Sequence, residues 1–209
     1  MKRRSLLIGT AAAGAAALGT TALGGCSVLP SQPYQERRDW PLVVRRPTAR
    51  PPARRGRVLL VRGLEAAPGM EARGVQWLEP DGSLHVDYWE QWAVPPAQAV
   101  EDDLRHWLAA SGLFAAVIGP GSRLDADLVL EGELTALRGD PGAHEARASA
   151  ALVLLDQRPA KLKVLMQQTV VGTAPLAGAA PAAVVAALQA AVAKLLGAAE
   201  AAVARAIAP

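Results

Sequence analysis

The segment DYWEQWAVPPAQAVEDDLRHWL, residues 87–108, passes from a strand pattern into a helix pattern at a pair of prolines. Proline is tolerated in the first turn of an α-helix, because the N–H groups there have no partner within the helix, so Pro95 and Pro96 mark a helix start. The apolar residues after them recur at helical spacing, at Val100, Leu104, Trp107 and Leu108. A strand that leads directly into an amphipathic helix favours an α+β fold.

The residues before this helix predict a β-hairpin. Two short apolar runs flank the dipeptide Asp81-Gly82, which is a strong turn signal. In the second run Leu84, Val86 and Tyr88 alternate with polar residues and with Trp89. We therefore expect Tyr88 to face the core and Trp89 to point the opposite way.

The rest of the chain supplies more strands and a second helix. Strand patterns cover 57–64, 113–119, 126–137, 145–156 and 161–173. From Pro181 to the C-terminus an Ala-rich segment carries its larger apolar residues at helical spacing. A membrane span is the competing interpretation of this segment, but Lys194, Glu200 and Arg205 would each be costly in lipid. We expect a two-layer α+β sandwich, in which a mainly antiparallel sheet packs two main helices on one face.

The N-terminus has the pattern of an export signal. Basic residues at positions 2–4 precede an uncharged run from Ser5 to Gly25. A membrane-spanning helix is the alternative, but Ala, Gly and Thr make up most of the run, so its insertion into a bilayer would be only weakly favourable. The sequence RRSLL also resembles a twin-arginine signal, which leaves the export route open between that pathway and general secretion.

The signal ends at LGGC, residues 23–26, which contains the only cysteine of the chain. This sequence resembles the lipobox of bacterial lipoproteins. The resemblance implies cleavage between Gly25 and Cys26, a diacylglyceryl group on the Cys26 thiol, and a further acyl chain such as palmitate on the new N-terminus. Two or more chains hold a protein firmly on a membrane. Ser27, where sorting rules place Asp in retained lipoproteins, implies the outer membrane, with the protein facing the periplasm.

Charge divides the remaining chain into an arm and a domain. The full sequence has 22 basic and 19 acidic residues, and without the signal the two counts are 19 and 19. Between residues 27 and 57 there are eight arginines and only two acids, together with six prolines. We interpret this arm as a tether near an anionic lipid surface. Nucleic-acid binding is the rival use of an arginine run, but a lipid-anchored exported protein meets little nucleic acid. The predicted division is a signal at 1–25, a lipidated tether at 26–56 and a domain at 57–209.

Residues able to carry chemistry are few. His85, His106 and His144 are far apart in sequence and have no second cysteine to join, so we expect no metal site. The glycine turn at 119–122 lacks the Lys-Ser/Thr of a phosphate-binding loop. The acids at 101–103 suit the first turn of a helix better than a catalytic pair. We expect no catalytic residues, no cofactor and no enzymatic activity.

The unusual residues are aromatic, because five tryptophans accompany only two tyrosines and one phenylalanine. Tyr88 and Trp92 are expected to fill core space between the hairpin and the helix. Trp89 is the better candidate for an exposed contact with a partner or with lipid. The sequence does not decide whether Trp77 is a core residue or an exposed contact.

Taken together, these motifs resemble the ABC-type transport auxiliary lipoprotein family. The resemblance rests on the lipobox, on residues 87–108, and on SGLFAAV and ADLVLEGEL in the same order. The arginine-rich arm and the very Ala-rich last helix depart from the family pattern.

The family implies a non-enzymatic subunit that helps to move phospholipid or other hydrophobic molecules between the inner and outer membranes. Its implied partners are an MCE-family periplasmic subunit and the ABC permease and ATPase. A domain of this size cannot enclose a lipid channel alone, so a conduit would need several copies, as in a homo-oligomer, or a groove shared with the partner. A lipoprotein with only a scaffolding role, and an exported enzyme, are the alternatives.

Overall fold

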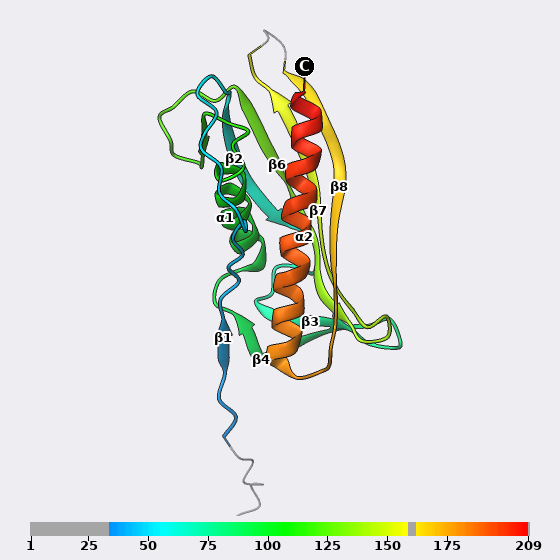
Figure 1. Ribbon diagram of the computed structural model, residues 1–209. Coiled ribbons are helices and arrows are strands. Elements are labelled where there is room, and N and C mark those ends of the chain that lie inside the picture. The colour runs from blue at the N-terminus through cyan, green and yellow to red at the C-terminus, as the bar shows by residue number, and fades with distance from the viewer. Residues whose placement is uncertain (1–33, 159–161, 209) are drawn as a thin grey trace, which may run out of the picture. The chain divides into compact units, whose positions relative to one another are not determined.

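A computed structural model describes residues 34–158 and 162–208 (Figure 1). The chain forms two units, residues 1–34 and 35–209, and the description below concerns the second. The predicted signal, its cleavage site at Gly25 and the lipidated Cys26 lie outside the described residues.

Eight strands and two helices make up the described fold. The strands are β1 (Arg38–Trp40), β2 (Val58–Ala66), β3 (Gly74–Leu78), β4 (Leu84–Trp92), β5 (Ala116–Ile118), β6 (Leu128–Asp140), β7 (Glu145–Asp156) and β8 (Lys163–Pro175). The helices are α1 (Pro96–Ala109) and α2 (Pro181–Ile207). The helix starts predicted at Pro96 and Pro181 are confirmed.

The strands form one mixed sheet, so the prediction of a mainly antiparallel sheet is wrong in this detail. β6, β7 and β8 form an antiparallel meander. On the other side of β6, however, β2 and β3 both pair with it in parallel, and β5 continues the sheet parallel to β2. Parallel neighbours need a crossover connection, and the segment with α1 returns the chain to run beside β2. The alternation of apolar residues that predicted the strands carries no information on their direction.

Both helices cover the same face of the sheet (Figure 1). α1 packs on β2 and β5, and α2 lies along β7 and β8. The leucines of the sheet that are closest to fully buried include Leu59, Leu130 and Leu154, and they pack in one core with Leu188 and Leu195 of α2. The predicted two-layer arrangement with both helices on one face is therefore present.

Helix α2 is long and apolar enough to cross a membrane by length and composition alone. Half of its most apolar window is nevertheless buried inside the domain, where it contacts β7 and β8. The expectation that this helix packs on the sheet is confirmed.

Helix α2 approaches the sheet very closely at Gly172 of β8. A Cβ atom added there would overlap the backbone of Ala191 and Leu195. Helix and strand thus touch backbone to backbone at this point, which only glycine permits. The small residues of α2 are what allow such close packing.

Part of the predicted tether packs against the domain. Leu42 and Val44 are buried, and the Val44 N–H donates to Asp103 Oδ2 on α1 at 2.8 Å. The Arg45 guanidinium contacts the same carboxylate at 2.8 Å. The domain start at residue 57 stays a prediction, but residues 38–40 pair with β4 and residues 41–46 are held along the helices, so this stretch does not hang free.

A second ion pair holds the arm to α2. Arg46 donates through Nε and Nη2 to the two carboxylate oxygens of Glu200, at 3.0 and 3.1 Å, and the indole N–H of Trp107 donates to the same group at 2.7 Å. Burial raises the pKa of Glu200, but the hydrogen bonds from Arg46 and Trp107 outweigh burial and leave this pKa below its usual value. Glu200 therefore joins the arm, α1 and α2.

We predict that Gly172→Ala lowers the free energy of unfolding by about 1–3 kcal/mol, the usual cost of overpacking. The added methyl group forces α2 away from β8. Gly178→Ala is the matched control, because nothing lies within 4 Å of a Cβ there, and its effect should stay within about 0.5 kcal/mol. Urea unfolding of both variants measures the difference, and equal stabilities would contradict the close approach.

Asp103 makes stability depend on pH. Burial raises the pKa of its carboxyl to about 6, against the opposing effects of the Val44 N–H and Arg45. Between pH 4 and pH 6 the folded chain then binds more protons at this site than the unfolded chain, so stability falls as pH rises through that window. We expect a loss of about 1–2 kcal/mol from this group.

Urea unfolding at several pH values checks this expectation. Asp103→Asn should remove the contribution of this carboxyl to the fall in unfolding free energy between pH 4 and pH 6. An unchanged slope in the variant would assign the pH dependence to other groups.

Candidate functional site

The hairpin of β3 and β4 carries most of the aromatic residues predicted to make contacts. Its turn forms as predicted at Asp81-Gly82, where the Glu79 N–H donates to the Ser83 carbonyl at 2.8 Å and Gly82 has a φ of 84°. The Asp81 carboxylate accepts hydrogen bonds from the backbone N–H and the hydroxyl of Ser83, and these lower its pKa.

Strand β4 contains a large bulge beside β3. Gly74 pairs with Gln91, and Gln76 pairs with Val86. Between these two pairs the chain advances by five residues along β4 but by only two along β3. Asp87 holds the bulge, because its carboxylate accepts the N–H groups of residues 89 and 90 at 2.7 and 3.0 Å. We call residues 87–90 the aromatic bulge.

The aromatic bulge presents Tyr88 and Trp89 together at the surface. Tyr88 is 63% exposed, and its ring meets that of Trp89 edge to face with centroids 4.9 Å apart. The guanidinium of Arg37 lies 4.7 Å from the centroid of the Tyr88 ring, within the range of a cation–π contact. Strict strand alternation would place Tyr88 and Trp89 on opposite faces of the sheet. In the aromatic bulge they form one patch.

The predicted inward placement of Tyr88 is wrong, because Tyr88 is exposed, as are Leu84 and Val86, which were predicted to share its face. Neither helix makes a substantial contact with β4, and β1 pairs only with its last three residues, from Glu90 to Trp92. No layer therefore covers the first part of the strand. The bulge then breaks the alternation from which the inward face was predicted.

Trp92 lies in the core, where it is 1% exposed. The core interpretation is confirmed for Trp92 and wrong for Tyr88. Next to it, the Trp40 indole N–H donates to the Glu90 carboxylate at 2.6 Å, and Arg38 lies 3.6 Å from the same carboxylate. The first strand of the arm is thus bonded to the base of the aromatic bulge.

Trp77 lines an apolar hollow at the same end of the domain. The hollow has a volume of about 360 Å³. Its lining comes from β3, the end of β6, the β6–β7 turn and the segment from β8 into α2, at Trp77, Gly139, Pro141, His144, Leu176, Gly178, Ala179 and Val184. We call this site the Trp77 hollow.

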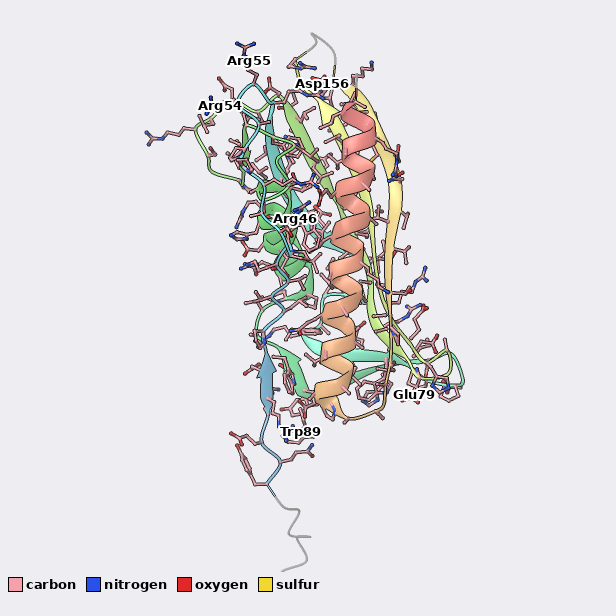
Figure 2. The ribbon with its side chains drawn as sticks, in the orientation of Figure 1. Arg46, Arg54, Arg55, Glu79, Trp89 and Asp156 are labelled. Atoms are coloured by element: carbon pink, nitrogen blue, oxygen red, sulfur yellow. The ribbon has the colours of Figure 1, made fainter. Side chains whose placement is uncertain are left out.

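The two ends of the domain differ in chemistry. Figure 2 shows Trp89 and Glu79 at one end and Arg54, Arg55 and Asp156 at the other. Arg54 and Arg55 are exposed. At the same end, hydrogen bonds from Arg158 to the Asp156 carboxylate lower the pKa of Asp156 to about 2. The arm therefore runs from the aromatic end to the arginine end.

Sequence reasoning found the aromatic residues but not the features that arrange them. Gly74 permits the bulge, because a Cβ there would overlap the backbone of Asp87. Gly139 leaves the space of the Trp77 hollow, and it lies beyond the strand predicted at 126–137, so no strand pattern singled it out. His144, with a φ of 54°, gave no signal at all.

Within residues 34–158 and 162–208 no three His, Cys, Asp or Glu side chains gather as metal ligands. His85 stacks on Trp77 with centroids 4.3 Å apart, His106 lies beside Asp102 on α1, and His144 lies in the β6–β7 turn. The geometry of the described residues offers apolar and aromatic surface for binding.

The fold and the sequence together define a class of protein in which a compact α+β domain follows a lipoprotein-type N-terminus. The family of ABC-type transport auxiliary lipoprotein components matches residues 41–199, and the chain belongs to this family. Membership makes it a lipoprotein that assists an ABC-type transport system, associated with a membrane on the periplasmic side.

Two solved structures share the fold. A crystal structure of a DUF330-family protein from Xanthomonas campestris is 21% identical, with a TM-score of 0.69, and the match covers 80% of this chain and 96% of that one. The crystal structure of an uncharacterized protein is 17% identical, with a TM-score of 0.59, covering 79% of this chain and 99% of that one. No curated protein matches the chain.

Two aromatic substitutions in the same strand should have opposite outcomes. Trp92→Ala removes a buried side chain and should cost about 3–5 kcal/mol of unfolding free energy. Tyr88→Ser removes an exposed ring and a cation–π contact and should cost less than about 1 kcal/mol. Urea unfolding compares them, and a large loss in Tyr88→Ser would show that the aromatic bulge is packed inside.

Proposed function

We propose that this chain is the non-enzymatic lipoprotein subunit of an MCE-type ABC system that moves phospholipid or other hydrophobic molecules between the inner and outer membranes. Family membership supports the association with an ABC-type transport system. The observation that carries the proposal is the aromatic bulge, because Tyr88 and Trp89 form an exposed patch that the fold itself leaves uncovered. Exposed aromatic residues of this kind are favoured as anchors for a protein partner.

The proposed anchor is the acylated Cys26, on the outer membrane and facing the periplasm. Arg38, the first residue of β1, lies twelve positions after Cys26. A chain of this length spans at most about 40 Å when fully extended. The aromatic bulge, which is bonded to β1 through Glu90, then stays within that distance of the anchor.

The proposed docking face is the aromatic bulge, and the proposed partner is the MCE-family subunit together with its permease and ATPase. The ion pairs of Arg45 and Arg46 orient the arm on the domain rather than toward lipid. Arg54 and Arg55 are exposed at the far end from the bulge (Figure 2), whereas Arg37, also exposed, lies against Tyr88 of the bulge. Any lipid conduit would be completed by the partner or by further copies of this chain.

Affinity purification of the tagged lipoprotein from detergent-solubilised envelopes tests the proposal. We expect the permease, the ATPase and the MCE subunit to co-purify with the wild-type chain. The double variant Tyr88→Ser with Trp89→Ser should recover about tenfold less, because hot-spot aromatic residues dominate such interfaces.

Leu124→Ser is the matched control, since Leu124 is also an exposed apolar residue but lies outside the hairpin. It should recover the wild-type amount. Recovery of no transporter subunit by the wild-type chain would contradict the proposal and favour a scaffolding role.

A further inference from the structure

The Trp77 hollow is a site that the fold builds without filling. Three separate segments converge on it, and its space of about 360 Å³ is open to the surface. At its floor, Gly139 pairs with Trp77 of β3 and with Ala146 of β7. A Cβ at Gly139 would meet the side chains of Trp77, Leu176 and Val184 at 3.6–3.8 Å, so these groups surround a space that no side chain occupies.

The walls of the hollow are apolar. Trp77 has one polar atom, and its indole N–H donates to the Glu79 carboxylate at 3.0 Å, so the rest of the ring offers carbon surface. Leu176 and Val184 add aliphatic surface. Apolar cavities hold water poorly and accept apolar ligands. The apolar lining therefore favours a hydrocarbon group as the ligand of the hollow.

A strained residue holds two walls together. His144 has a φ of 54°, in the left-handed region that non-glycine residues rarely adopt. Its carbonyl accepts the N–H of Leu176 at 2.9 Å, which joins the β6–β7 turn to the segment leading into α2. Backbone strain of this kind persists where the surrounding structure imposes it, often at ligand sites.

The size of the hollow limits its occupant. Ligand pockets in proteins have volumes of about 300–1,000 Å³, and this one is at the lower end of that range. A complete two-chain lipid is too large, whereas one chain can enter and leave its headgroup outside. The hollow also lies at the same end of the domain as the aromatic bulge, the end where β1 enters (Figure 2).

We propose that the Trp77 hollow holds one acyl chain of a phospholipid taken from the membrane or from the transport partner. This inference rests on the proposed lipid-transport function. It assigns to this chain a direct contact with the transported molecule, in addition to its contact with the partner.

Photo-cross-linking tests the proposal on the mature lipidated chain in phosphatidylethanolamine vesicles. The probe is a phosphatidylcholine with a diazirine near the end of one acyl chain. After irradiation, mass spectrometry of peptides should locate cross-links at Trp77 and within residues 176–184. Gly139→Leu, which fills the hollow, should reduce these cross-links about tenfold.

Gly63→Leu is the matched control, because nothing lies within 4 Å of a Cβ at Gly63 and this position does not line the hollow. It should cross-link as the wild type does. Circular dichroism should show that both variants fold. If Gly139→Leu does not fold, Ala179→Leu fills the hollow from the loop before α2 and should give the same reduction.

Three outcomes would overturn the proposal. An absence of cross-links in the hollow, or equal cross-linking in Gly139→Leu, would remove the lipid site. Cross-links that appear only in a non-acylated Cys26→Ala chain would assign the hollow to the protein's own acyl chain. If cross-linking succeeds while the affinity purification recovers no transporter subunit, the acyl-chain site stands and the transport role fails.

Discussion

The backbone contact between α2 and β8 at Gly172 is the constraint on which the path of the arm and the Trp77 hollow depend. It lets a 27-residue apolar helix lie directly on the sheet, where it stays part of the domain. The same helix supplies Glu200, which holds the arm through Arg46, and Val184, which forms one wall of the Trp77 hollow. One close approach thereby sets both the path of the arm and the shape of the candidate ligand site.

The domain separates its surfaces by chemistry along its length. One end combines the aromatic bulge with the Trp77 hollow, and the other carries Arg54 and Arg55 (Figure 2). The sheet also carries a surface ion pair, with Arg62 Nη1 and Glu131 Oε2 3.0 Å apart. The exposed aromatic pair and the apolar hollow suit the first end for contact with hydrophobic molecules or partners.

Local patterns in the sequence predicted the elements well and their arrangement less well. The prolines at 95, 96 and 181 and the Asp81-Gly82 turn act within a few residues, so their predictions were confirmed. Strand direction depends on pairing between distant segments, which alternation does not encode. The aromatic bulge depends on Gly74 opposite Asp87, and the hollow on Gly139 between Trp77 and Val184, so neither could be found from neighbouring residues alone.

The central claim is that this lipoprotein takes part in moving lipid and does not only support an assembly. The most direct measurement is the rate of fluorescent phospholipid transfer between vesicles by the reconstituted transport system, with and without the lipidated chain. The account predicts that transfer slows when the chain is omitted and recovers when it is added back. An equal rate in both conditions, with the remaining subunits assembled, would contradict it.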